Sequence, residues 1–293
     1  MQVLLLLIPV SLYGLAWVFM KKYQRTAGSG KFASAFYNMV GGGISFAVLF
    51  CISGFSLFWN WQTLICAIVF GCGLALYNGL KVKAASHGPL SLISMSTTLG
   101  AVILTMLYGF IFLHEPVTVL KIVAVVLVIC SFIPIIKEQR GAKISAKFVL
   151  FCFLAFSGNG ILTVVSKIAQ QYTPDTGKTV DFIALYFFFC FISSAGFLMP
   201  SLARAGEIER RQVFSIPAIL IAALAVGSNT LAALCSFYLS FRFDSSVQFP
   251  ILNIGIMIFT TVSAFIIYRE KPDRVTLVGL ALATAAVVCI SLS

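Results

Sequence analysis

The sequence predicts an all-α polytopic membrane protein with ten transmembrane helices built from two inverted five-helix repeats. Three observations lead to this prediction: a very apolar composition, a succession of long apolar runs, and a set of residues shared by the two halves of the chain. The 293 residues are 60% hydrophobic and only 10% charged, with a mean hydropathy of +1.04. An average soluble domain is about a quarter charged, so an ordinary globular protein is excluded.

Ten apolar runs, bounded by charged residues, Gly or Pro, are each long enough to form a membrane span. A spanning helix needs roughly 20 mostly apolar residues to cross a hydrocarbon core of about 30 Å. The first run has no basic residue before it and no small-residue cleavage site after it, which favours a span over a signal peptide. The expected spans are residues 2–20, 33–53, 62–80, 89–113, 117–136, 148–170, 182–202, 213–241, 245–268 and 274–292.

The basic residues indicate membrane orientation rather than nucleic-acid binding. Lys and Arg number 20 against 9 Asp and Glu, but they lie in short gaps between apolar runs, so no nucleic-acid partner is expected. Sixteen of them follow spans 1, 3, 5, 7 and 9. The positive-inside rule therefore predicts that these loops are cytoplasmic and that both termini lie outside. The eight scattered cysteines are expected to be small core residues, and no metal or cofactor is expected.

An internal repeat relates two short stretches that each join a fourth to a fifth span. An offset of 155 residues lays FLHEPVT, residues 112–118, on IYREKPD, residues 267–273, so that Glu115 falls on Glu270. Further matches lie seven residues apart, which places each set on one face of a helix. The matched pairs are Ser91 with Ser246, Thr98 with Asn253, and Thr105 with Thr260.

A second match lies near the start of each half. Gly14 precedes Lys21 by seven residues, and Gly160 precedes Lys167 by seven. The offset here is 146 residues, so the two halves differ by a short insertion between their first and fourth spans.

The two predicted repeats are residues 1–137 and 146–293, with five spans each. Because five is odd, two similar units in one chain must cross the membrane with opposite polarity. Many secondary transporters are built from inverted repeats of this kind, with the substrate site near the midplane where the repeats meet.

In these residues the chain resembles the EamA type of the drug/metabolite transporter superfamily. In that family each repeat opens with an aromatic residue and Gly, followed seven residues after the Gly by Lys, and its fourth span ends in an acidic residue. This chain departs from the pattern in having Tyr13 and Asn159 where the family usually has Trp. The resemblance implies secondary transport of a small solute, commonly outward. The residues that carry it are Tyr13, Gly14, Lys21 and Glu115 in the first half, and Gly160, Lys167 and Glu270 in the second.

A transported solute would have to meet polar groups in the middle of spans. Each such residue could instead hydrogen-bond another helix and hold the bundle together, at about 1 kcal/mol. As a set, the Asn and Gln residues exceed what packing alone needs, and we expect a cavity lined by spans 3, 4, 8 and 9. The candidates are Asn38, Tyr77, Asn78, Ser94, Thr98, Asn159, Tyr186, Asn229, Gln248 and Asn253.

The glycines, lysines and glutamates that recur in the two halves are expected to be structural. Gly14, Lys21, Glu115, Gly160, Lys167 and Glu270 are predicted to pack, cap or hinge helices, with Glu115 at the N-terminus of span 5, where the helix dipole favours a negative charge.

The expected solute is neutral, zwitterionic or aromatic. No Asp or Glu lies at the centre of a span by these boundaries, which disfavours a proton-driven mechanism and a strongly cationic substrate. Export is favoured, for example of an amino-acid-like or drug-like solute. The alternatives are an uptake permease or exchanger for a vitamin, sugar or nucleoside-type solute, and, from another class, a channel or structural membrane subunit.

The sequence lacks H-E-x-x-H, G-x-S-x-G and paired intramembrane Asp, so no enzyme activity is expected. The expected location is a bacterial inner membrane, and the expected partners are the solute and the lipid bilayer. Proton or exchange coupling, and a monomer or homodimer, are left open.

Overall fold

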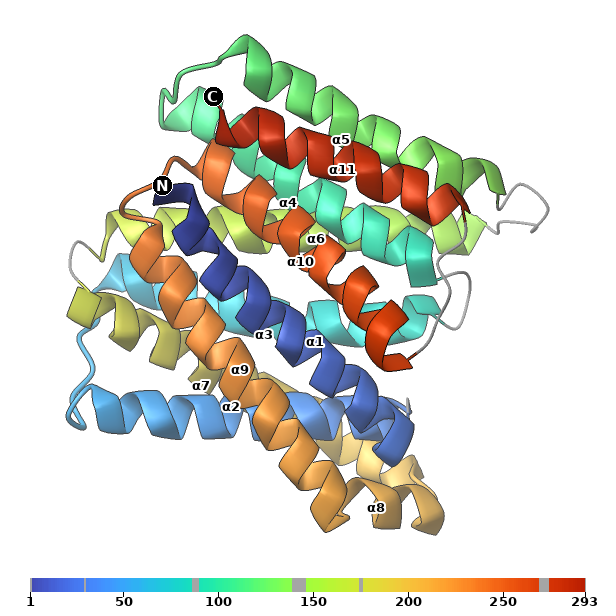
Figure 1. The fold of residues 1–293 in the computed structure, drawn as a ribbon. Coiled ribbons are helices and arrows are strands. Elements are labelled where there is room, and N and C mark those ends of the chain that lie inside the picture. Colours follow the sequence, from blue (N-terminus) through green and yellow to red (C-terminus); the bar gives the residue numbers. More distant parts are fainter. Residues whose placement is uncertain are drawn as a thin grey trace. The chain divides into compact units, whose positions relative to one another are not determined.

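The structure is a computed structural model that describes residues 2–28, 30–85, 90–138, 146–173, 176–268 and 274–292. Within these ranges a short 3-10 helix leads into eleven α-helices, and there is no strand (Figure 1). The elements are η1 (Gln2–Leu6), α1 (Leu7–Ala27), α2 (Lys31–Ile52), α3 (Trp61–Ala85), α4 (Leu90–Phe112), α5 (Val119–Glu138), α6 (Ala146–Gln171), α7 (Thr176–Arg204), α8 (Glu207–Val213), α9 (Ile216–Leu239), α10 (Ser245–Tyr268) and α11 (Arg274–Ser291).

Seven helical segments in the described part of the chain are long and apolar enough to cross a membrane. They correspond to predicted spans 1, 2, 3, 6, 7, 8 and 9, in α1, α2, α3, α6, α7, α9 and α10. The other three predicted spans coincide with α4, α5 and α11, whose described apolar stretches are shorter, at Ser96–Phe112, Val119–Cys130 and Leu277–Ala286. The prediction of an all-α polytopic membrane protein is confirmed.

Contacts divide the chain into two compact units, and each unit takes helices from both halves of the sequence. The first unit consists of Met1–Gly14, Lys83–Val164 and Arg242–Ser293, and the second of Leu15–Val82 and Val165–Phe241. Three of the four boundaries between them fall inside continuous helices, α1, α3 and α6. Neither unit is therefore a separate stretch of sequence.

The second unit is organised around the contact between α2 and α7. A β-carbon at Gly42 would lie 2.8 Å from the backbone nitrogen of Phe191, so the two backbones are close enough to require glycine. Small residues at helix interfaces allow this approach in membranes, where helices gain little from burying apolar surface. One aromatic-rich cluster around Phe182 and Tyr186, and another around Tyr23 and Phe32, fill the rest of this unit.

In the first unit α5 packs against α11, and α4 packs against α10 (Figure 1). The helix α4 also crosses α6 in backbone contact, because a β-carbon at Gly100 would collide with the carbonyl group of Phe156. On the other side of this crossing, a β-carbon at Gly160 would lie 2.6 Å from the carbonyl oxygen of Gly100. Two glycines thus set the distance between these helices.

The glycine contacts of the first unit occur in matched pairs. Two glycine contacts between α4 and α6 have counterparts between α10 and α1 when the offset of 155 residues is applied to α4 and the offset of 146 to α6. The counterparts are Gly100 to Phe156 with Gly255 to Val10, and Gly160 to Leu104 with Gly14 to Phe259. Equivalent positions of the two predicted repeats therefore make equivalent contacts.

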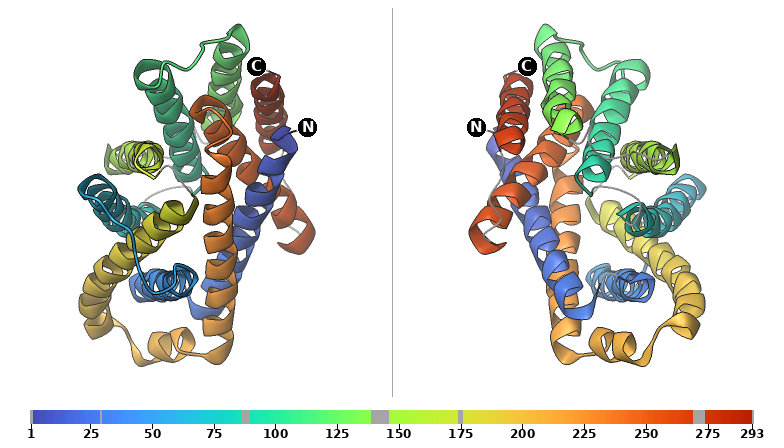
Figure 2. Two further views of the ribbon diagram at one scale, coloured as in Figure 1. Left: turned by 90° about the vertical axis from the view of Figure 1, so that its left-hand side faces the viewer. Right: turned by 90° about the vertical axis from the view of Figure 1, so that its right-hand side faces the viewer.

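The short helix α8 accounts for the unequal offsets. In the second unit the contact of Gly43 with Phe191 has its counterpart in the contact of Phe188 with Phe46. An offset of 145 residues relates Gly43 to Phe188 and Phe46 to Phe191. The offset rises from 145 at α2 and α7 to 155 at α4 and α10, so the second half has ten more residues in this part. The seven-residue helix α8, which the sequence does not predict, lies there, between α7 and α9 (Figure 2).

We expect Gly100→Ala to lower the free energy of unfolding by about 1–3 kcal/mol, because its β-carbon would displace the backbone of α6. Gly227→Ala in α9 is the matched control: nothing lies within 4 Å of its added β-carbon, and alanine favours a helix. Thermal unfolding in detergent would compare the two. A Gly100→Ala protein that unfolds at or above the wild-type temperature would contradict the close crossing.

Candidate functional site

The polar residues predicted to line a cavity are divided between the two units. Ser94 lies on α4, but its side chain is outside the described residues, as is the whole of Glu270. The candidates in the first unit are Thr98, Asn159, Gln248 and Asn253. Those in the second unit are Asn38, Tyr77, Asn78, Tyr186 and Asn229.

Asn159 joins α6 to α4 beside the glycine crossing. Its Nδ2 donates a hydrogen bond to the backbone carbonyl of Thr97 at 2.9 Å. The adjacent Thr98 is buried, with 9% of its surface exposed. Asn159 therefore has at least a packing role, and its partner is a main-chain group that side-chain patterns do not reveal.

Pro250 interrupts the backbone hydrogen bonding of α10 close to two candidates. Proline has no amide hydrogen, so it leaves a carbonyl of the preceding turn without its helical donor. Asn253 donates from Nδ2 to the Phe249 carbonyl at 2.9 Å, within its own helix. Gln248, two residues before Pro250, is completely buried. Asn253 is half-buried, and its side-chain carbonyl makes no hydrogen bond to the described residues.

Glu115 lies between α4 and α5 in the chain, and its side chain reaches the N-terminus of α10. Its Oε2 accepts a hydrogen bond from the backbone amide of Ser246, the second residue of that helix, at 2.9 Å. The negative charge is favourable there because the first amides of a helix lack internal partners. The sequence predicts a cap on span 5, but the helix that Glu115 contacts is α10, 131 residues away along the chain.

His114 ends α4 through its backbone. It has a φ of +52°, in the left-handed region that His adopts more readily than most side chains. The amide of the next residue, Glu115, then donates to the carbonyl of Gly109 at 3.1 Å. His114 is exposed, and it is a chain-reversal residue beside a capping glutamate.

Lys121 is a buried cation that is not among the site residues predicted from the sequence. Only 2% of its surface is exposed, although it lies in the first turn of α5. Its Nζ donates to the Pro116 carbonyl at 3.0 Å and lies 3.8 Å from Oδ2 of Asp244, just before α10. An unpaired buried charge costs several kcal/mol, so these partners are what allow the burial. A lysine four residues inside an apolar span was the available signal.

Lys167 binds the C-terminal end of α9, as Glu115 binds the N-terminal end of α10. Its side chain is 9% exposed, and Nζ donates to the carbonyl of Ser240, the C-cap of that helix, at 3.4 Å. A cation is favourable at a helix C-terminus because the last carbonyls carry partial negative charge. Its repeat equivalent, Lys21, is half-buried on α1.

The second unit brings two predicted residues into direct contact. Nδ2 of Asn78 on α3 donates to Oδ1 of Asn38 on α2 at 3.0 Å, and both side chains are half-buried. Tyr186 is instead part of an aromatic core, with its ring centroid 4.6 Å from that of Phe70. Tyr77 is 9% exposed beside Asn78, and the remaining candidate, Asn229, is half-buried on α9.

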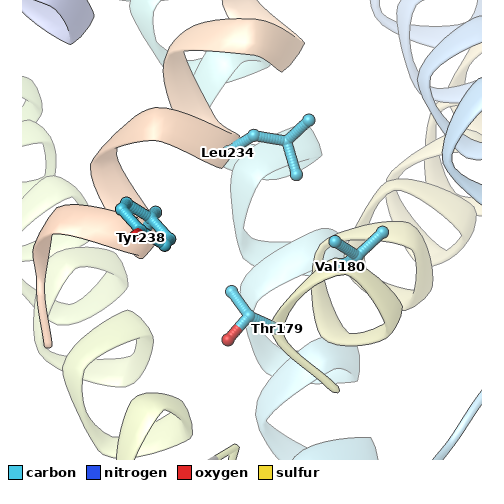
Figure 3. Close-up of a pocket in the computed structure, with 4 residues that line it drawn as sticks. All are labelled: Thr179, Val180, Leu234 and Tyr238. Carbon is cyan, nitrogen blue, oxygen red and sulfur yellow. The ribbon is translucent and has the colours of Figure 1, made fainter. Parts of the chain in front are cut away.

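A small pocket in the second unit lies between α7 and α9. Thr179 and Val180 face Leu234 and Tyr238 across it, and its volume is about 170 Å³ (Figure 3). Solute pockets usually measure about 300–1,000 Å³, so this one is small for a transported metabolite. None of its four residues was predicted from the sequence.

Residues 1–136 match the model of the EamA-like transporter family, which belongs to the drug/metabolite transporter superfamily. Through this segment the chain is similar to the EamA-like transporter family. The matched segment includes Gly14, Lys21 and Glu115. Proteins of this family are transporters, and the chain is an integral, multi-pass membrane protein.

The fold of the chain also occurs in a solved structure described as "Crystal structure of protein". The two share 13% sequence identity with a TM-score of 0.71, over 99% of this chain and 96% of that one. At this identity the likeness shows the fold alone. No curated protein matches the sequence.

We expect Glu115→Ala to lower the free energy of unfolding by about 1 kcal/mol, because the Ser246 amide loses its acceptor. Glu115→Gln keeps an acceptor oxygen and should retain part of this stability. His114→Gly is the neighbouring control and should be neutral or stabilising, since glycine adopts a positive φ easily. Thermal unfolding would test the series, and equal stability of all three variants would contradict the cap.

Proposed function

We propose that the chain is a secondary transporter that moves a small neutral, zwitterionic or aromatic solute outward across a bacterial inner membrane by alternating access. The observation that carries this proposal is the set of matched contacts at equivalent positions of the two halves. Inverted repeats can exchange conformations to open a shared site to either side of the membrane. The match of residues 1–136 to a transporter family supports transport in general, and the contacts support this mechanism.

The repeats in this proposal are residues 1–137 and 146–293. The matched contacts join different helices in each case, α4 with α6 and α10 with α1, which is what two copies of one five-helix unit would produce. Gly14 and Gly160, predicted from the sequence as packing residues, take part in this set.

The described charges support a solute without a strong net charge. Glu115 and Lys167 bind the ends of α10 and α9, and Lys121 is paired with Asp244 beside the start of α10. Asp181, near the start of α7, accepts a hydrogen bond from the amide of Phe58 at 3.1 Å. Each of these ionisable groups has a structural partner, whereas the half-buried polar candidates Asn38, Asn78 and Asn253 are amides, which suit neutral or zwitterionic solutes.

Counterflow distinguishes this transporter from a channel or structural subunit. Proteoliposomes would be screened with amino acids, vitamins, sugars, nucleosides and quaternary amines, after a thermal-shift screen has ranked ligands by stabilisation. Unlabelled solute trapped inside should accelerate entry of the labelled solute through a carrier. The absence of acceleration for every solute that binds would contradict alternating access, and reversing the solute gradient would show which direction the protein supports.

We expect Thr98→Ala and Asn253→Ala to raise the KM for the transported solute about ten-fold each, since each removes a hydrogen-bonding group from the proposed cavity. Thr261→Ala on α10 is the control, because its hydroxyl bonds only the Met257 carbonyl of its own helix among the described residues. Initial rates of uptake into proteoliposomes provide the measurement. Unchanged kinetics in both folded variants would remove these residues from the cavity.

A further inference from the structure

We propose that Asn38 and Asn78 are a solute-recognition pair, and that the solute carries a neutral amide-like group with a hydrogen-bond donor beside an acceptor. This inference rests on the proposed transport function and names the chemistry of its substrate. The pair is formed by α2 and α3 within the second unit.

The pair makes a single hydrogen bond among the described residues, which leaves most of its hydrogen-bonding groups unused. Each amide has two N–H donors and a carbonyl that can accept two bonds. The bond from Nδ2 of Asn78 to Oδ1 of Asn38 is the one that they make with the described part of the chain. The amide nitrogen of Asn38 and the carbonyl of Asn78 make no hydrogen bond to the described residues, so the pair keeps one donor group and one acceptor group unused.

The environment of these groups indicates a hydrated space. Both side chains are half-buried, within helices that are apolar enough to cross the membrane. A polar group that faces hydrocarbon without a partner costs several kcal/mol, so non-satisfied groups in a membrane protein face water or a ligand. The open side of the amide pair therefore meets water or a solute rather than lipid.

A second polar pair in the same unit shows what a purely structural contact looks like. The hydroxyls of Ser45 on α2 and Thr230 on α9 are 2.6 Å apart, with 1% and 5% of their surfaces exposed. Thr230 also donates to the Val226 carbonyl at 2.9 Å. This pair is closed and satisfied, whereas the amide pair is open.

The amide pair also departs from the internal repeat. The offsets of 145 and 155 residues that relate contacts in the two halves carry Asn38 to Ile183 and Asn78 to Ala233. These counterparts are apolar and buried, with 0% and 2% exposed. The fold therefore holds one copy of this helix pair without amides, which indicates that the amides in the other copy are not needed for packing.

The chemistry of the pair selects a particular kind of group. A carboxamide, lactam, urea or nucleobase edge presents a carbonyl next to an N–H, and would form two opposed hydrogen bonds with Asn38 and Asn78. A carboxylate has no donor for the Asn78 carbonyl, and a quaternary ammonium has no hydrogen bond to offer. A bound solute that lacks the donor or the acceptor would leave an amide group of the pair without a partner, and this cost discriminates against such solutes.

The test is counterflow in proteoliposomes with four probes: uracil and nicotinamide, which carry the amide-like edge, and nicotinate and choline, which lack it. The double variant Asn38→Ile/Asn78→Ala installs the residues found at the equivalent positions of the other half, so the scaffold should accept it. We expect wild-type protein to exchange an amide probe and the variant to lose at least about ten-fold in rate. Ser45→Ala/Thr230→Val, the structural control, should lower the unfolding temperature while keeping the preference among probes.

Two results would overturn the inference. One is exchange of an amide probe by the double variant at the wild-type rate, and the other is exchange by wild-type protein of nicotinate or choline only, or of none of the four. The wider solute panel judges transport itself, so exchange of a solute without an amide leaves the proposed function intact. If the double variant does not fold, the single variants Asn38→Ala and Asn78→Ala decide the question by the same ten-fold criterion.

Discussion

Inside a bilayer there is no water to complete a hydrogen bond, and this constraint explains where the charges and close contacts of the protein lie. Backbone groups within a helix satisfy one another, but the first amides and last carbonyls do not. The chain supplies Glu115 to the start of α10 and Lys167 to the end of α9, from elements distant in sequence. These residues satisfy the two helix ends on either side of one short connection and also fix where the helices begin and end.

The same constraint gives polar residues within helices two different roles. A buried, satisfied pair such as Ser45 and Thr230 only holds helices together, since nothing can reach it. The half-buried amides of Asn38 and Asn78 keep unused capacity that a solute could fill. The exposure of a polar side chain, rather than its polarity alone, distinguishes a packing contact from a group that a solute could reach. The sequence shows polarity but not exposure, so the candidates predicted from it include both Tyr186 of the aromatic core and the half-buried amide pair.

Local patterns in the sequence were sufficient for much of the fold. Continuous apolar runs predict spans because the bilayer thickness sets helix length, and the repeated Gly to Lys spacing located Gly14 and Gly160. Partners far along the chain were not predictable: Glu115 has the chemistry of a cap, but no local signal shows that it binds α10. The helix α8 was missed because seven residues with four charges have no apolar run. Lys121 was missed because its burial depends on Asp244, which lies on another segment.

The division of the chain into two units has a mechanical consequence. Since α1, α3 and α6 each pass from one unit into the other without a break, a change in the relation of the units cannot be absorbed by loops there. It must appear as curvature in those helices, which resist bending unless a proline, a glycine or an inserted group weakens their hydrogen bonding. Gly14 lies at the boundary in α1, and Gly160 is four residues before the boundary in α6. In α1 and α6, the glycines that let helices pack closely thus also lie at or near the points where these helices would have to bend.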